Sequence, residues 1–369
     1  MDKKLNVLQV NKLYYPHIGG IETVIQSISE NLKDRLNVQV LVCQPKGKGS
    51  VDTINGVKIT RCSSLGTYFS MPVSFEFIRK FRQMAKNSDI VHIHVPFPLG
   101  DLACLLSGYK GKVIIYWHSD VVKQKKLLTF YKPLMNRFLK RADCIMVATQ
   151  GHIDGSPYIS KFKDKCKIIP YGLNLQDYSI TGDILSKKLV NKKNLKVLFV
   201  GRLVYYKGVD ILVKAFKKVT GCELFIVGTG KLENELKSMA CDMSNTIHFL
   251  GALSNEDLKK ALSDCDIFVL PSVENSEAFG IVQMEAMAYG KPVINTSLPT
   301  GVPYVSLNGI TGITVKPYDI QQLTDAIQSL VDNPELRQSY GKNAYNRVRN
   351  VYDNKKIMND IYNLYNDIV

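Results

Sequence analysis

The sequence predicts an α/β protein built from two Rossmann-like domains, each with a doubly wound parallel sheet. Short apolar runs typical of strands alternate with amphipathic segments from one end of the chain to the other. The pattern also restarts, because residues 5–10 open one series of strands and residues 195–200 open a second. A length of 369 residues exceeds one ordinary core and suits two domains.

Several of the expected strands are apolar almost throughout, as strands buried on both faces should be. The first series is expected at 5–10, 37–43, 57–62, 89–95, 112–117, 144–149 and 166–170. The second is expected at 195–200, 222–227, 246–250, 267–271, 292–296 and 312–315. Between the strands, apolar spacings of three and four over 209–216 predict a helix. Another helix is expected from about Phe279 to a stop at Gly290.

Domain boundaries follow from composition. Residues 1–180 should form the first domain and residues 181–351 the second, and the polar stretch 181–194 reads as a linker. The tail from about 352 to 369 carries an apolar stripe at helical spacing. We expect that helix to pack back on the first domain.

The net charge of +15 is uneven, since residues 1–180 alone carry +13. A one-sided basic field favours an anionic partner: a phospholipid surface, a lipid diphosphate or nucleic acid. No nucleic-acid module is recognisable, which disfavours the third. The apolar runs fall short of the roughly 20 residues that a membrane span needs. Eight cysteines without a CxxC pair suit reduced thiols in a cytoplasmic protein.

Ligands of such sheets bind beyond the carboxyl ends of the strands, where the strand order reverses. After the first strand, Gly19 and Gly20 allow close backbone approach of an anion at a helix start. After the strand at 195–200, Arg202 and Lys207 form a cation pair that suits a diphosphate. Two solvated surface cations are the alternative.

Carboxylates and a histidine follow other strands. Glu277 precedes a helix start, and Glu285 lies within that largely apolar helix, where a carboxylate needs a partner such as a ligand hydroxyl. A narrow polar edge of the helix is the alternative explanation for Glu285. His118 ends the strand at 112–117 and could hydrogen-bond a sugar, although a lone histidine is more often structural.

Taken together, these residues resemble the retaining glycosyltransferases of family 4, which have the GT-B fold. The resemblance spans essentially the whole chain. Glu277 and Glu285 match the E-x7-E motif of that family, and Arg202 and Lys207 match its basic pair. Residues 117–120, 271–280 and 301–304 are most similar to bacterial mannosyltransferase-like enzymes of O-antigen and exopolysaccharide assembly.

The resemblance implies roles for these positions. Catalysis would involve Glu277, His118, Arg202 and Lys207. The donor would be held by Gly19, Gly20, Gly201, Arg202, Lys207, Gly228, Glu277, Ala278, Phe279, Gly280, Ile281 and Glu285, the last on the ribose hydroxyls. The acceptor side would include His17, His94 and Asp120. Many family members have glycine where this chain has Ala278, which leaves the identity of the sugar open.

The implied reaction moves a hexose from a nucleotide sugar to a lipid diphosphate-linked saccharide. GDP-mannose is the first expected donor, and UDP-sugars are the alternative. No metal or other cofactor is expected, because Arg202 and Lys207 would supply the positive charge. We expect a cytoplasmic enzyme that is peripheral to the inner face of the membrane. The basic, apolar stretch 122–141 could touch anionic lipid or simply pack in the core.

Other classes of protein are less well supported. A sugar-nucleotide epimerase or hydrolase would share the fold, whereas an oxidoreductase lacks its GxGxxG after either opening strand. Asp264-Cys265-Asp266 imitates a metal-binding DxD but precedes a strand, as Asp89 and Asp143 do, so all three indicate helix-to-strand turns. A zinc site at His92, His94 and His118 would lack an evident second shell.

Overall fold

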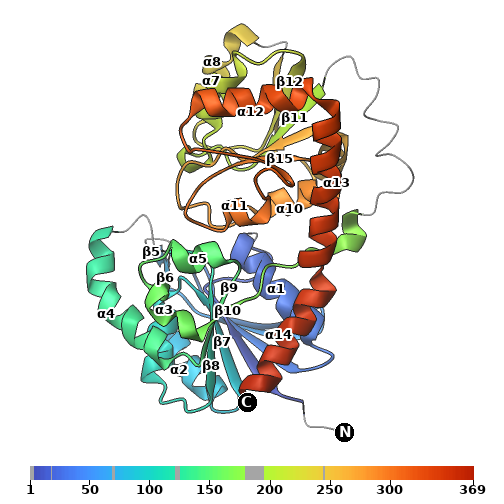
Figure 1. Cartoon of the computed structure of the whole chain (residues 1–369). Helices are drawn as coiled ribbons and strands as arrows, with labels where there is room; N and C mark the ends of the chain where they lie inside the picture. The colour runs from blue at the N-terminus through green and yellow to red at the C-terminus, as the bar shows by residue number, and fades with distance from the viewer. Residues whose placement is uncertain (1–3, 18, 69–70, 121–124, 179–194, 244–245) are drawn as a thin grey trace. The chain divides into compact units, whose positions relative to one another are not determined.

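The computed structural model describes residues 4–17, 19–68, 71–120, 125–178, 195–243 and 246–369 (Figure 1). The chain divides into two compact units, which are described separately. One comprises residues 1–171 with 356–369, and the other comprises Gly172–Lys355. Both are α/β units of the Rossmann type, so the predicted fold class is confirmed. The predicted linker at 181–194 lies outside the described residues.

The first unit contains an eight-stranded sheet in the order β10-β9-β8-β7-β1-β2-β4-β3. Its strands are β1 Asn6–Val10, β2 Asn37–Cys43, β3 Ser50–Ile54, β4 Val57–Cys62, β7 Ile90–Val95, β8 Lys112–Trp117, β9 Cys144–Val147 and β10 Cys166–Ile168, beside a small hairpin of β5 Thr67–Tyr68 and β6 Met71–Pro72. The helices are α1 Gly20–Leu32, α2 Phe75–Ala85, α3 Pro98–Leu106, α4 Lys125–Arg141, α5 Gln150–Asp154 and η1 Ile159–Lys165. Helix α14, Asn354–Ile368, completes the unit, except that its first two residues belong to the second unit.

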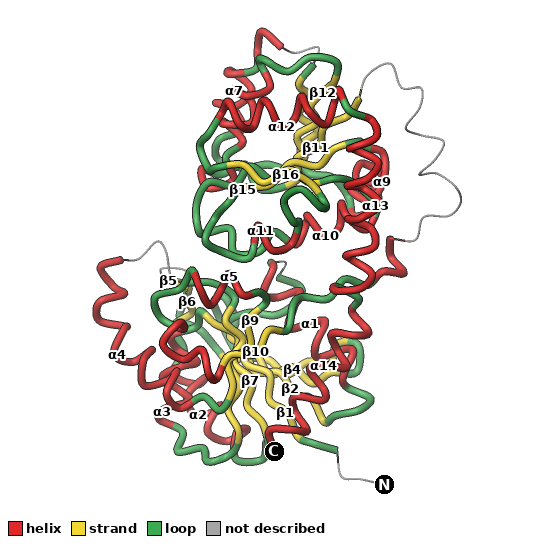
Figure 2. Tube along the Cα trace, viewed as in Figure 1, coloured by secondary structure: helices red, strands yellow, loops and turns green. Residues whose placement is uncertain are grey.

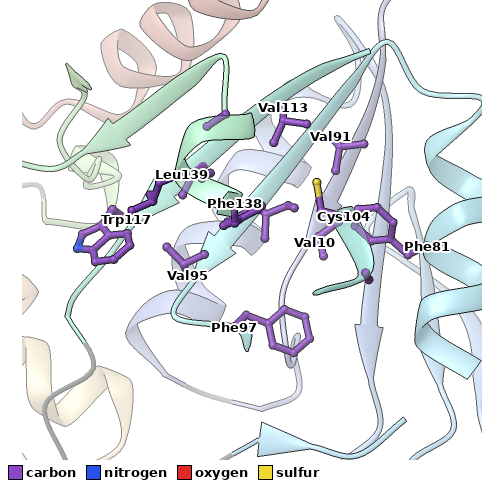
Figure 3. Packing of buried hydrophobic residues seen from close by; sticks show 14 of the residues in the cluster. Val10, Phe81, Val91, Val95, Phe97, Cys104, Val113, Trp117, Phe138 and Leu139 are labelled. Carbon is purple, nitrogen blue, oxygen red and sulfur yellow. The ribbon is translucent and has the colours of Figure 1, made fainter. Parts of the chain in front are cut away.

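Alternation along the strands sorts the side chains of the first sheet into two layers. Apolar residues of β1, β7 and β8 point toward α2, α3 and α4 and form one large core. Figure 3 shows Val10, Val91 and Val113 from the strands beside Phe81, Cys104 and Phe138 from the helices, among others. The opposite face carries the buried polar residues Gln9, His92 and His94 beside a smaller apolar cluster, and it is covered by α1 and α14 (Figure 2).

The prediction of an all-parallel first sheet is wrong at one edge. Strand β3 pairs antiparallel with β4 through a tight hairpin. Asn55 and Gly56 form its turn, with φ values of 47° and 83°, the left-handed conformation that two-residue hairpins require. Residues 50–54 alternate between half-buried and exposed, so they lack the apolar run used to find the other strands.

The second unit contains a six-stranded sheet in the order β13-β12-β11-β14-β15-β16, and all its strand pairs are parallel. The strands are β11 Leu195–Val200, β12 Cys222–Val227, β13 Ile247–Gly251, β14 Ile267–Val269, β15 Val293–Thr296 and β16 Gly312–Val315. The helices are η2 Leu175–Tyr178, η3 Tyr205–Lys207, α7 Val209–Phe216, α8 Glu233–Met239, η4 Cys241–Met243, α9 Asn255–Asp264, α10 Ile281–Ala288, α11 Val302–Val305, α12 Ile320–Asp332 and α13 Pro334–Val351. Helices α7, α8 and α12 share one core with the sheet.

The unit boundaries differ from the predicted 180/181 and 351/352. Residues 172–178 belong to the second unit because Leu173 exchanges backbone hydrogen bonds with Tyr352 and Asn354, and because Tyr178 contacts α10. The tail is not continuous with the helix before it, since α13 ends at Val351 and α14 begins at Asn354. Hydrogen bonds between residues distant in sequence set these boundaries, and such bonds cannot be predicted from local composition.

Candidate active site

The strand order of the second sheet reverses at β11, which lies between β12 and β14. A crevice beyond the carboxyl ends of β11 and β14 is therefore the expected ligand position. The loop after β11 carries Arg202 and Lys207, and the loop after β14 carries Glu277. Parallel pairing of the two strands brings these loops together at one edge of the sheet.

Lys207 and Glu277 form an ion pair where these two loops meet, and each side chain is only 11% exposed. Glu277 Oε2 also accepts a hydrogen bond from the hydroxyl of Ser272, at 3.2 Å. An ion pair so poorly solvated is held by its partners rather than by water. The predicted cation and the predicted carboxylate are thus one structural element before any ligand is bound.

Arg202 lies on the same loop and is positioned by an aromatic residue. Its Nη2 donates to the hydroxyl of Tyr206 at 2.8 Å. The carbonyl of Tyr206 in turn accepts from the backbone N–H of Val273 at 2.9 Å, which joins the loop after β11 to the loop after β14. Ser272 and Tyr206 were not predicted as site residues, because a lone serine or tyrosine gives no sequence signal.

The neighbouring loops approach each other too closely for side chains. Gly228 has φ +127°, and a Cβ there would lie 2.0 Å from the carbonyl oxygen of Gly201. Gly201 donates its N–H to the carbonyl of Val227 at 2.9 Å. Both predicted glycines therefore shape the floor of the crevice by letting two backbones touch.

Helix α10 begins later than predicted, at Ile281, with Gly280 as its N-cap in the left-handed conformation at φ 75°. Phe279 is buried, and the carbonyl of Ala278 accepts from the N–H of Gly301 at 2.7 Å. The loop 277–280 therefore reaches the helix start in a fixed path, and the first N–H groups of α10 follow Glu277 closely in the chain.

A buried amide network, missed by sequence reasoning, fixes this helix start. Gln283 donates to the carbonyl of Phe279 at 3.0 Å, and Asn295 on β15 donates to Gln283 Oε1 at 2.9 Å. Asn295 also donates to the carbonyls of Val302 and Ser306, at 3.0 and 3.1 Å. Both amides are fully buried, so each of these bonds replaces one that water cannot supply.

Glu285 lies one turn into α10 and has a protein partner. The hydroxyl of Tyr178 donates to its Oε1 at 3.1 Å, and Lys259 lies with its Nζ 5.4 Å from the Tyr178 ring. Burial raises the pKa of Glu285, while the Tyr178 hydroxyl and Lys259 lower it. Glu285 thus belongs to a second group of residues, distinct from the Lys207–Glu277 pair.

In the first unit, Gly19 and Gly20 lie at the start of α1, at the carboxyl end of β1, which is flanked by β2 and β7. The carboxylate of Glu22 folds back over Gly19, where a Cβ would lie 2.2 Å from Glu22 Oε2. His17 is exposed on the loop before the helix. The strand order reverses at β1, so this loop also lies at a switch point.

His94 and His118 take part in a buried hydrogen-bond chain. His94 Nδ1 lies 2.9 Å from His118 Nε2, His94 Nε2 lies 2.9 Å from Gln9 Oε1, and His118 Nδ1 lies 2.7 Å from the hydroxyl of Tyr171. Burial and the neighbouring histidines hold the pKa of both rings well below the usual value. This differs from the expected contact of each ring with substrate, because both nitrogens of each ring already have protein partners.

The hydrogen-bond chain continues from Gln9 to the C-terminal helix. Gln9 Nε2 donates to the hydroxyl of Tyr365 on α14 at 2.9 Å, and that hydroxyl lies 2.6 Å from His92 Nδ1. His92 and His94 share one face of β7 as predicted, and their rings stack with centroids 4.8 Å apart. The nitrogens bond in sequence rather than converge on one point, so the rings form a chain and not a zinc ligand set.

Asp120 follows β8 and is held by two donors. Its Oδ1 accepts from Trp117 Nε1 at 3.0 Å and from the hydroxyl of Ser156 at 2.7 Å. Burial raises the pKa of this carboxyl. Asp120 is therefore fixed at the carboxyl end of the first sheet, next to His118.

The three aspartates that precede strands act as predicted, as parts of helix-to-strand turns. Asp266 accepts from the backbone N–H of Lys196, Asp89 from that of Asn6 and Asp143 from that of Val113, each at 2.8 Å. Each carboxylate satisfies the N–H group at or next to the start of a neighbouring strand. The DxD at 264–266 thus has a structural use.

Comparison with known proteins is consistent with this geometry. Residues 18–177 match the family described as glycosyltransferase family 4, and residues 182–347 match glycosyl transferases group 1. The chain is 31% identical to O-antigen chain mannosyltransferase C of Escherichia coli, over 99% of both chains. It is 32% identical to the D-rhamnosyltransferase WbpZ of Pseudomonas aeruginosa, over 94% of this chain and 92% of that one.

Among solved structures, HepE of Anabaena in complex with UDP is similar in fold. The TM-score is 0.78 at 18% identity, over 98% of this chain and 100% of that one. Two Rossmann-like units in this arrangement of strands constitute the GT-B fold. No helix in the described parts of the chain is both long and apolar enough to cross a bilayer.

Proposed function

The chain belongs to glycosyltransferase family 4, and from that membership we propose that it transfers mannose from GDP-mannose to a lipid diphosphate-linked saccharide, with retention of configuration. The similarity to an O-antigen chain mannosyltransferase supports mannose and a surface polysaccharide. A UDP-sugar is the alternative donor, and the solved UDP complex of a protein of similar fold favours it.

The observation that carries the proposal is the poorly exposed Lys207–Glu277 ion pair, which forms where the loops after β11 and β14 meet, ahead of the start of α10 at Ile281. The departing diphosphate gains negative charge in the transition state, and only groups already aimed at it lower the barrier. Lys207, Arg202 and the first N–H groups of α10 would supply that stabilisation without a metal. Asp264 and Asp266 are each bonded to Lys196 and do not enter this role.

Glu277 would have two tasks. It holds Lys207 in place before the donor arrives, and its second oxygen would accept a hydroxyl of the donor sugar. Lys207 would then be shared between the carboxylate and the diphosphate. No residue is assigned as a carboxylate nucleophile. Attack from the same face, with the donor phosphate accepting the proton of the acceptor hydroxyl, is the mechanism that the family implies.

A thermal-shift screen with GDP, UDP and their sugars tests the donor site. We expect one nucleotide and its sugar to raise the melting temperature. Glu285→Ala should abolish that response, because Glu285 would bind the ribose hydroxyls. Glu256→Ala, at a surface glutamate on α9, is the matched control. Absence of any shift would contradict the proposal, and a full shift in Glu285→Ala would remove its ribose role.

Product analysis separates transfer from the other reactions of similar folds. A transferase forms a glycoside only when the acceptor is present. An epimerase or hydrolase would convert the nucleotide sugar equally well without acceptor. Conversion that does not depend on acceptor would therefore replace the proposed reaction with one of these two.

For the acceptor, we propose that the first unit binds the anionic inner face of the membrane. It carries most of the net positive charge, and Phe130 on α4 is 85% exposed beside Lys132. The other half of the apolar stripe of α4 is core, since Met135, Phe138 and Leu139 are buried. Residues 121–124 lie outside the described part of that stretch.

Liposome flotation tests this membrane proposal. The wild-type protein should float with vesicles containing an anionic lipid and stay behind with neutral ones. A variant with Phe130→Ser and Lys132→Gln should bind the anionic vesicles less. Unchanged flotation would exclude this exposed part of α4 as the membrane contact.

A further inference from the structure

Two exposed tyrosine rings lie beside the crevice of the second unit, and neither has a role in the chemistry described above. Tyr205, in η3 after β11, is 50% exposed, and Tyr318, after β16, is 55% exposed. Exposed single rings are common on protein surfaces, and these two are of interest because both are linked to the candidate donor site.

Tyr318 is joined to the candidate donor site by Glu274, on the loop after β14. The Tyr318 hydroxyl donates to Glu274 Oε1 at 2.6 Å. Glu274 in turn accepts the backbone N–H of Glu277 through its carbonyl, at 3.0 Å. The group Tyr205, Glu274 and Tyr318 is hereafter called the tyrosine patch, and it is continuous with the candidate donor site.

Tyr205 is linked to the same site through its neighbour. The rings of Tyr205 and Tyr206 meet edge to face with centroids 5.7 Å apart, and Tyr206 receives the Arg202 hydrogen bond. Tyr205 therefore lies one ring away from the cation expected on the diphosphate. A sugar bound there would be adjacent to the reacting end of the donor.

The backbone of Tyr318 has a positive φ, which is unfavourable for a residue other than glycine. Among the described residues, only Asn55 and Tyr318 have positive φ without being glycine, with φ of 47° and 65°. Asparagine tolerates that conformation in a tight turn, but a tyrosine does so at a cost that glycine would avoid. The ring contributes little to the core because it is more than half exposed. Besides its bond to Glu274, the ring therefore offers an accessible face to a ligand.

We propose that the tyrosine patch binds a pyranose ring of the growing glycan, as a saccharide subsite on the second unit. A tyrosine offers a flat apolar face to the C–H groups of a sugar and a hydroxyl at its rim, with little conformational entropy to lose. The Glu274 carboxylate, beside Tyr318, would also accept sugar hydroxyls. This inference rests on the proposed function, because it places the saccharide acceptor beside the candidate donor site.

The patch suits a saccharide better than a lipid chain or a protein groove. It is small and includes the Glu274 carboxylate, which would disfavour an acyl chain. An anionic headgroup would be repelled by Glu274. Neutral sugar rings satisfy both the aromatic faces and the hydrogen-bond acceptor.

Saturation-transfer NMR with mannotetraose, in the absence of donor, tests the subsite. The wild-type protein should bind, and Tyr205→Ala and Tyr318→Gly should each weaken binding by about tenfold. Glycine at position 318 accepts φ 65°, so that variant should melt no lower than the wild type and separates binding from folding. Tyr68→Ala removes an equally exposed ring from the first unit and should bind normally.

The response to nucleotide distinguishes this inference from the proposed function. All three variants should keep the wild-type thermal shift with the preferred nucleotide. Wild-type affinity for mannotetraose in both patch variants would overturn the subsite, as would no binding by a wild-type protein that still responds to nucleotide. Absence of the nucleotide response would instead contradict the donor site.

Discussion

Replacing Lys207 with methionine tests the ion pair on which the donor site depends. The substitution keeps the apolar stem and removes the charge, which leaves Glu277 with the Ser272 hydroxyl as its remaining donor. Breaking a buried ion pair by removing one partner costs about 3–5 kcal/mol. The 11% exposure of both side chains and the Ser272 bond favour the lower end, about 3 kcal/mol. For a unit of this size that corresponds to a melting temperature lower by roughly 6–12 °C.

A double-mutant cycle isolates the interaction. Glu277→Gln alone leaves the ammonium of Lys207 buried, whereas the double variant leaves neither charge. We therefore expect the double variant to be more stable than the sum of the single losses by about 2 kcal/mol. Calorimetry and guanidinium unfolding measure the difference. Lys237→Met breaks an exposed pair with Glu233 on α8 and should cost under about 0.5 kcal/mol.

The reasoning fails if Lys207→Met destabilises the protein no more than Lys237→Met and the cycle shows no coupling. The two groups would then be solvated independently in solution. The crevice would lack its preformed charge pair, and the proposed stabilisation of the diphosphate would lose its basis.

Three further predictions concern buried polar groups. Asn295→Leu removes the donor to Gln283 Oε1 and to the Ser306 carbonyl and should cost about 3 kcal/mol in urea unfolding, whereas the surface change Gln321→Leu should stay within about 0.5 kcal/mol; similar values would contradict the network. Tyr178→Phe removes a hydrogen bond that lowers the pKa of Glu285, so the carboxylate should become protonated at a higher pH. As the pH falls, the nucleotide response of this variant should therefore be lost at a higher pH than that of the wild type, and an unshifted profile would exclude a role for Tyr178 in the ionisation of Glu285. Burial lowers the pKa of His92 to about 3, so the native ring stays neutral while the unfolded ring gains a proton below about pH 6.5. Its contribution to stability is lost at about 1.4 kcal/mol per pH unit as pH falls through that window, and His92→Phe should flatten the slope by this amount.

Local sequence patterns predicted most of the fold. Every expected strand exists within two residues of its predicted limits, because strands buried on both faces are recorded as apolar runs. Strand β3 was not predicted because its residues alternate in exposure and form no apolar run, although Asn55-Gly56 is a recognisable hairpin turn. The loops that follow β11 and β14 were also identified, together with Arg202, Lys207 and Glu277.

The supporting residues could not be found in the same way. Gln283 and Asn295 are single amides whose spacing has no period, and they meet because β15 pairs beside β14 and α10 follows between them. Tyr178 reaches Glu285 across more than a hundred residues of chain. Contacts of this kind depend on the path of the chain in space, which composition does not encode.

The sequence by itself determined the two α/β units, the order of their strands along the chain and the residue types that suit a nucleotide sugar. The tertiary structure alone decided which of those residues meet. It joined Lys207 to Glu277 at the reversal of strand order and placed Tyr205, Glu274 and Tyr318 on one edge. It also enclosed His94 and His118 in a chain closed by Tyr365. Period and propensity act over a few residues, whereas hydrogen bonds between distant strands and loops require the assembled sheet.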